Sequence, residues 1–209
     1  PDVPDEWPTL RQTVAYRDKI RGSLLESFDA LPEANATNPI AENGRVFQLV
    51  LEHEYMHQET LLYMLQQTPL EKKIRPASLP EYSFRPAPPC QMIRVHAGTA
   101  RLGAKYDEID FGWDNEFPEM LVHVPEFRID SLPVTNGEFL DFVESGAYDD
   151  EQFWRPEDWQ WKALENKRHP ACWRQHNGRW LYPAMFDVFP LQNVASWPVY
   201  ASLAEARAY

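Results

Sequence analysis

The stretch Leu51 to Leu65, LEHEYMHQETLLYML, carries two histidines, His53 and His57, that lie four residues apart. Its apolar residues recur at helical spacing, and this pattern predicts one helix over Arg45 to Gln67. Because four residues are slightly more than one helical turn, both imidazoles leave the same face of that helix. Apolar residues continue the same stripe on both sides of the pair. We therefore expect the two histidines to face a protein core.

Two imidazoles that face inward one turn apart are typical of half a metal site. Burial of both rings leaves four ring nitrogens to be satisfied side by side, and a shared metal ion would do this. We predict that His53 and His57 are metal ligands, with a hydrogen-bonded core histidine as the alternative for each. The pair does not identify the metal, because imidazole suits zinc, iron, copper and nickel. Glu54 and Glu59 are rotated away from this face, so we interpret them as supporting or solvated residues.

The segment His53 to His57 also matches the H-E-x-x-H signature of zinc proteases, in which Glu54 would be the general base. The metzincin form of that motif needs a glycine and a histidine at the positions of Thr60 and Tyr63. The other large zincin class takes its third ligand from a glutamate on a following helix. Pro69 interrupts the stretch where that helix would begin. A zinc hydrolase therefore stays an alternative.

The composition is that of an ordinary globular protein with an acidic balance. The chain has 209 residues, of which 44% are hydrophobic and 25% are charged, which allows one large domain or two small ones. Its formal net charge of −12 argues against a nucleic-acid partner or an anionic membrane surface. The apolar runs are too short to cross a bilayer, so we expect no membrane partner. Cys90 and Cys172 make no disulfide framework, and we expect a cytoplasmic protein.

The composition changes near residue 75. The first third is rich in leucine, glutamate and glutamine, whereas most of the nineteen prolines and eight tryptophans follow residue 76. Such a shift is typical of a domain boundary. We assign residues 1–75 to a partial helical domain, residues 76–90 to a proline-rich linker and residues 91–209 to an α+β domain. Two helices cannot enclose a core by themselves, so the helical domain needs further packing partners.

Local patterns predict the elements within these parts. Thr9 and Gln12 are spaced as a capping box at the start of a helix that runs from about residue 8 to 31. Alternating apolar residues predict strands over residues 92–102, with a turn inside, and over residues 121–129. Thr135 and Ser202 are each followed three residues later by glutamate, so both are predicted to cap helices.

Two stretches carry a resemblance to a known family. HEYMHQETLLYML resembles the H-x3-H-x-E segment of the DinB-like helical domain in ergothioneine-type sulfoxide synthases. The segment FGWDNEFPEMLVHVPEFRIDSLPVTNGEFLDFVESGAY, with FWRPEDWQW and WPVYASLAEARAY, resembles the first half of a formylglycine-generating-enzyme-type domain, which has a C-type-lectin-like fold. The combination resembles the EgtB family and its ovothiol and selenoneine relatives. It implies an α+β protein with a DinB-like helical bundle portion followed by this lectin-like domain.

This resemblance implies a non-haem iron(II) enzyme that uses Fe(2+) and dioxygen. Members of the family join the sulfur of a cysteine-type thiol to the imidazole of trimethylhistidine and oxidise that sulfur to a sulfoxide, a step of ergothioneine biosynthesis. Cysteine and γ-glutamylcysteine both fit as the thiol. A related ovothiol or selenoneine synthase stays an alternative, as does a metal-free lectin-like binding module.

The resemblance also carries site residues. His53 and His57 match two of three iron-binding histidines of the family, whose third ligand lies on an earlier helix. The sequence has no histidine before His53, so we expect the third ligand to precede Pro1 in the native protein. We also expect the second half of the lectin-like domain, with its active-site tyrosine, to follow Tyr209. The catalytic residues beyond the metal are therefore not assigned.

Two arginines are candidates for substrate binding. Arg17 and Arg21 lie one turn apart on the preceding helix and could bind a substrate carboxylate, with surface ion pairing as the alternative. For the tryptophans at 154, 159 and 161 we expect a role in the core and not in a binding box. We interpret the acidic run at residues 114–116 as a turn and not as a calcium site.

Overall fold

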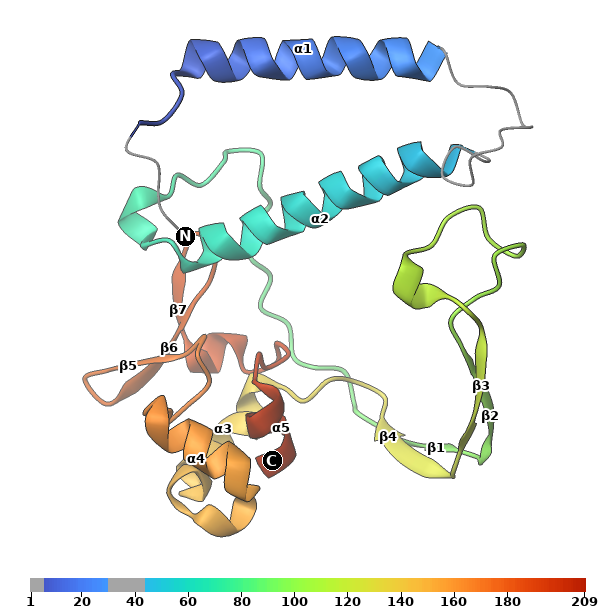
Figure 1. The fold of residues 1–209 in the computed structure, drawn as a ribbon. Coiled ribbons are helices and arrows are strands. Elements are labelled where there is room, and N and C mark those ends of the chain that lie inside the picture. Colours follow the sequence, from blue (N-terminus) through green and yellow to red (C-terminus); the bar gives the residue numbers. More distant parts are fainter. Residues whose placement is uncertain (1–5, 30–43) are drawn as a thin grey trace. The chain divides into compact units, whose positions relative to one another are not determined.

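In a computed structural model of the chain, residues 6–29 and 44–209 are described. Helices, short 3-10 helices and small sheets alternate along them, which confirms the predicted α+β class (Figure 1). The chain forms two compact units. The first comprises Pro1–His57 and Arg101–Met120, and the second comprises Gln58–Ala100 and Leu121–Tyr209. Within the described ranges, no helix is both long and apolar enough to cross a membrane.

Two long helices open the described chain. Helix α1 (Leu10–Asp29) begins after the predicted capping box. There the Thr9 amide donates to Gln12 Oε1 at 2.8 Å, and the Gln12 amide donates to Thr9 Oγ1 at 3.3 Å. The last two residues predicted for this helix, 30 and 31, lie outside the described residues. Helix α2 (Arg45–Gln67) has the predicted bounds.

A loop between β2 (Gly98–Leu102) and β3 (Met120–Val124) completes the first unit. Gly103 has a φ of 72°, and a Cβ atom there would lie 2.7 Å from the carbonyl oxygen of Glu116, so only glycine suits this turn. The rings of Tyr106 and Phe117 stack at 4.1 Å, and the Arg45 guanidinium lies 5.8 Å and 5.9 Å from their centroids. This contact joins the start of α2 to the loop.

The predicted turn at residues 114–116 is confirmed. Asp114–Glu116 forms a 3-10 helix, and the Glu116 carboxylate accepts a 2.7 Å hydrogen bond from the Trp113 amide. This carboxylate stabilises the start of the 3-10 helix, and the oxygen that accepts the bond is already occupied and is not free to bind a cation.

The strands form three small sheets. β1 (Met92–Val95) pairs antiparallel with β4 (Phe127–Asp130), and β2 pairs with β3. The predicted turn between the first two strands is confirmed, but the single strand predicted over residues 121–129 is wrong. It divides into β3 and β4 around Pro125, because proline lacks the amide proton that a ladder requires. The third sheet has the order β5 (Arg174–His176), β6 (Arg179–Pro183) and β7 (Val188–Pro190).

The hydrophobic core lies in the second unit, among α3 (Asn136–Glu144), α4 (Pro156–Leu164), α5 (Leu203–Ala208) and the third sheet. The capping boxes predicted at Thr135 and Ser202 are present. Trp154 is buried and donates from Nε1 to the carbonyl oxygen of Ala147, and Trp159 packs against the same core. The buried members of the core are Phe139, Tyr148, Trp154, Trp173, Tyr182, Ala184, Leu191, Val194 and Ala208.

The start of α3 is joined to a segment about sixty residues later. The amides of Asn136 and Gly137 donate to the carbonyl oxygens of Trp197 and Ala195 at 2.8 Å and 2.9 Å. The fully buried Asn136 side chain also donates to the carbonyl oxygen of Val194 at 3.0 Å. These bonds satisfy backbone groups that would otherwise be orphaned at a buried helix start.

The proline-rich segment predicted as a linker has contacts of its own. Residues 76–90 contain no helix or strand, as their proline content predicts. Within them, Tyr82 packs edge-on against Phe189 at 4.9 Å, and Phe84 stacks on Trp197 at 6.2 Å with an interplanar angle of 8°. This part of the segment therefore packs on the core of the second unit, while the domain bounds of residues 75 and 90 stay a prediction.

Candidate metal centre

The two histidines of α2 lie together as their spacing predicts. The ring centroids of His53 and His57 are 4.4 Å apart, and the rings meet edge to face at 87°. Both rings therefore lie on the same face of one helix, as two ligands of a shared metal must. As a donor set, two imidazoles suit iron(II) or zinc(II), but a protein site for either metal needs at least one further ligand.

The expectation that this face of α2 is buried is wrong for the described residues. Both histidine rings are exposed, and no residue of α2 is buried. On the same stripe, Leu61 and Met64 keep 64% and 56% of their surface exposed. The physical reason is that α1 and α2 are too few to enclose a core. In the first unit, Phe28 of α1 packs on Phe47 of α2 at 4.7 Å, close to one end of each helix.

The third ligand predicted for this site is not among the described groups. In residues 6–29 and 44–209, no cluster of three histidine, cysteine, aspartate or glutamate side chains could hold a metal. The other histidines have different surroundings: His96 Nδ1 lies 3.5 Å from Glu126, and His169 packs edge-on against Trp180. The assignment of His53 and His57 as ligands, and of a third ligand outside this sequence, therefore stays a prediction.

The geometry bears on the zinc-hydrolase alternative. Helix α2 ends at Gln67, and after Pro69 the chain forms only a 3-10 helix, Leu70–Lys72, in which Glu71 is exposed. The following helix that would carry a glutamate ligand is thus absent from this stretch. Glu54 is exposed on α2, one residue and about 100° beyond His53. Its position suits a solvated carboxylate.

The arginines proposed for substrate binding lie on the exposed surface of α1. Arg17 donates from Nε and Nη2 to Asp18 Oδ1 at 2.9 Å and 2.7 Å, with 65% of the Arg17 side chain exposed. Arg21 is also exposed. An exposed pair of this kind contributes between about 0 and 1 kcal/mol, so a substrate carboxylate could replace Asp18 at little cost. Binding of substrate by Arg17 and Arg21 stays a prediction.

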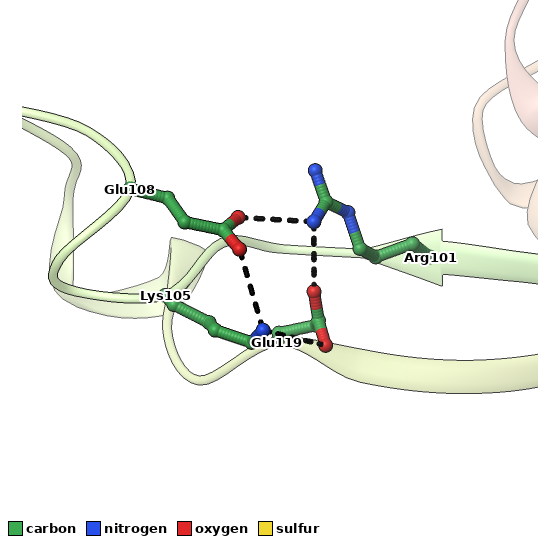
Figure 2. Close-up of polar contacts among 4 residues, drawn as sticks. All are labelled: Arg101, Lys105, Glu108 and Glu119. Carbon is green, nitrogen blue, oxygen red and sulfur yellow. Dashed lines mark hydrogen bonds and ion pairs between the residues drawn. The ribbon is translucent and has the colours of Figure 1, made fainter.

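A charged cluster that the sequence patterns did not indicate joins Arg101 of β2 to three residues of the loop that follows it in the first unit (Figure 2). Arg101 Nη1 contacts Glu108 at 2.9 Å and Glu119 at 3.0 Å, while Lys105 Nζ lies 3.3 Å from Glu108 and 3.9 Å from Glu119. The hydrogen bond to Glu108 and the charge of Glu119 raise the pKa of Lys105. Only the Lys105–Glu108 spacing of three was visible in the sequence. The charges balance, so the cluster holds the loop together and offers no free ligand set.

Comparison with known proteins places these features in context. Residues 78–209 match the protein family described as Sulfatase-modifying factor enzyme 1-like domain. The chain is 30% identical over 200 residues to the hercynine oxygenase of Mycolicibacterium smegmatis, an alignment that covers 92% of this chain and 44% of that protein. It is 32% identical over 177 residues to the hercynine oxygenase of Mycobacterium tuberculosis, covering 81% of this chain and 38% of that protein.

A fungal protein is similar over a still larger part of the chain. Ergothioneine biosynthesis protein 1 of Neurospora crassa is 27% identical over 234 residues, which covers 98% of this chain and 26% of that protein. The chain thus spans less than half the length of each of these curated relatives. Their names confirm the predicted resemblance to the ergothioneine-type enzymes.

Proposed function

Because the chain belongs to the family of the sulfatase-modifying factor enzyme 1-like domain, we propose that it is part of an iron(II)-dependent, oxygen-dependent sulfoxide synthase of ergothioneine biosynthesis. The observation that carries the proposal is the joint presence of the histidine pair and the matched domain in one chain. Residues 78–209 alone indicate only the family. The alignments to two hercynine oxygenases extend over 92% and 81% of the chain, well beyond that domain.

The proposed reaction joins a cysteine-type thiol to the imidazole of trimethylhistidine. The S–H bond of the thiol and a C–H bond of the imidazole break, and a C–S bond forms between the two. One oxygen atom of dioxygen becomes the sulfoxide oxygen, and the other takes up the two hydrogens and leaves as water. Dioxygen is thereby reduced by four electrons, two from bond formation and two from the sulfur. When bound, iron(II) would supply a site for the thiolate and for oxygen activation.

The residues of this chain have separate roles in that reaction. His53 and His57 would hold the metal through neutral nitrogens and leave other positions open to substrates. Arg17 and Arg21 would bind a carboxylate of a substrate with the forked guanidinium geometry that suits it. Cys90 and Cys172 are free thiols, and we place the reaction in the cytoplasm, where such thiols stay reduced.

Metal analysis and oxygen uptake of the full protein, purified without oxygen, test this proposal. Iron content, with oxygen consumption that requires both a thiol and trimethylhistidine, is expected for the native protein. His53→Ala and His57→Ala should each abolish both, whereas His123→Ala, which alters an exposed histidine of β3, should leave them unchanged. Zinc with peptide cleavage would instead support the hydrolase, and the absence of bound metal would support a binding module.

A further inference from the structure

The end of α4 and the turn after it form a pocket of about 330 Å³ in the second unit. Neither histidine of the metal pair lines it. Its lining includes Lys162, Lys167 and Arg168, together with Trp159 and Asp149. We propose that this pocket binds a small anion that bears a phosphate or carboxylate group. Its volume is at the lower end of the range for small-molecule sites.

Lys162 is the most buried of the three cations that line the pocket. Only 7% of its surface is exposed. Its Nζ lies 4.6 Å from the centroid of the Trp159 ring and 5.8 Å and 5.9 Å from those of Trp154 and Tyr148. In the described part of the chain, no oxygen accepts a hydrogen bond from this ammonium group, which has three donors. Among the described residues, the one buried side-chain polar atom without a hydrogen-bond partner is Asp158 Oδ2, so the Lys162 ammonium group keeps some surface open to the pocket. The ring faces attract its charge, and an anion in the pocket would accept hydrogen bonds from it.

The charges around the pocket also favour an anion. Lys162, Lys167 and Arg168 contribute three positive charges, whereas Asp149 contributes one negative charge and lies 3.1 Å from Arg168 Nη1. The chain as a whole has a formal net charge of −12, so this concentration of cations departs from the rest of its surface. Confinement in a pocket strengthens their joint field.

The carboxyl end of α4 works against an anion, but only weakly. The carboxyl end of a helix carries a partial negative charge of about half an elementary charge. Here the amide of Asn166 donates to Ala163 at 3.2 Å, and the amide of Lys167 donates to the carbonyl oxygen of Lys162 at 3.0 Å. These bonds occupy the carbonyl groups of Lys162 and Ala163, and the side chains leave a net charge of two positive units at the pocket.

Burial lowers the pKa of the Lys162 ammonium group, Asp149 opposes that effect and Arg168 adds to it. A bound anion would favour the charged form and raise this pKa. The same lysine could instead serve only to pack α4 against the core. If the pocket binds an anion, removal of the Asp149 charge should tighten that binding. If Lys162 only packs α4 against the core, the same change should have no effect on anion binding.

Titration calorimetry of the full chain with inorganic phosphate, and separately with succinate, tests the proposal without any metal. We expect saturable binding of at least one of these anions, weakened about tenfold in Lys162→Met. Lys72→Met, which removes the same charge from an exposed lysine outside the pocket, should not weaken it. Asp149→Asn should tighten binding, because it removes the opposing carboxylate and frees Arg168.

Lys162→Arg preserves the positive charge and is the second test variant. It is needed if Lys162→Met fails to fold, and circular dichroism would reveal that failure. It should keep anion binding within a few fold of the native chain. The proposal is overturned if neither anion binds the native chain saturably. It is also overturned if Lys72→Met weakens binding as much as Lys162→Met, or if Asp149→Asn weakens it.

Discussion

The phenol of Tyr148 donates a 2.7 Å hydrogen bond to Oε1 of Glu205, and both side chains are buried. The other carboxylate oxygen of Glu205 accepts from the amide of Ser202 at 2.7 Å. One carboxylate thus joins the 3-10 helix at Ala147–Asp149 to the capped start of α5. A buried charge of this kind is tolerated only while its hydrogen bonds are made.

Removal of the Tyr148 hydroxyl should therefore destabilise the second unit. Tyr148→Phe keeps the ring but leaves a buried carboxylate oxygen without its donor, which is expected to lower the free energy of unfolding by about 2 kcal/mol. Urea denaturation followed by tryptophan fluorescence measures this difference. Tyr200→Phe, at a side chain that is 72% exposed, is the matched control and should change stability by less than about 0.5 kcal/mol. Equal effects of the two variants would contradict the role given to the Tyr148–Glu205 bond.

Stability should also fall in alkaline solution because of Tyr182. Burial raises the pKa of this phenol to about 12, whereas an unfolded tyrosine ionises near about 10. The pKa of Tyr182 is higher in the folded chain than in the unfolded chain. The protonated phenol therefore makes its full contribution to the free energy of unfolding below about pH 10, and this contribution is lost as the pH rises through about 12. Tyr182→Phe should make the free energy of unfolding fall less steeply in this window. Urea denaturation at a series of pH values checks this, and an unchanged slope would refute it.

The charged cluster around Glu119 should contribute a small, salt-sensitive stabilisation. Glu119 lies within 3.0 Å of Arg101 and 3.9 Å of Lys105, and 16% of its side chain is exposed. Glu119→Gln is expected to lower stability by less than about 1 kcal/mol at low salt, and by still less at high salt, because mobile ions screen such pairs. Thermal unfolding at two salt concentrations measures the effect, with Glu71→Gln as an exposed control. A salt-independent loss would show that the cluster matters through packing.

Glu54 separates the two metal chemistries. In the proposed oxygenase, Glu54→Gln should keep iron binding and change thiol-dependent oxygen uptake by less than about threefold, because this side chain is exposed and points away from the histidine stripe. Loss of a general base in a hydrolase would instead cost at least about a hundredfold. Oxygen uptake and peptide cleavage, measured on the same preparation, decide between them. Glu59→Gln is the control, and loss of iron in Glu54→Gln alone would contradict the proposed arrangement.

Local patterns predicted the elements that depend on near neighbours. The bounds of α2 follow from apolar spacing, and the starts of α3 and α5 follow from the Thr135 and Ser202 capping boxes. The division of one predicted strand at Pro125 was also available from the sequence, because proline cannot donate in a ladder. The prediction that His53 and His57 lie together on one face required only their separation of four, whereas the edge-to-face angle of their rings was not predicted.

Features that depend on distant residues could not be predicted in this way. Nothing local indicates that Phe84, in a proline-rich stretch, stacks on Trp197, or that Trp173 Nε1 donates to Asn136 Oδ1 at 3.0 Å. The pocket around Lys162 likewise depends on Asp149, which reaches it from another segment. The burial of the α2 histidine face was wrongly predicted for a related reason, since periodicity shows which face is apolar but not what covers it.

The hydrogen bonds between the start of α3 and residues 195–197 have a consequence for how the domain is made. A ribosome adds residues in order, so α3 is synthesised about sixty residues before its partners at Ala195 and Trp197. Until then the buried Asn136 has neither of these backbone partners, and closure of so long a loop carries an entropic cost. The second unit can therefore complete its core only after Ala195 and Trp197 have been synthesised, and its exposed aromatic rings must be kept from aggregating until then.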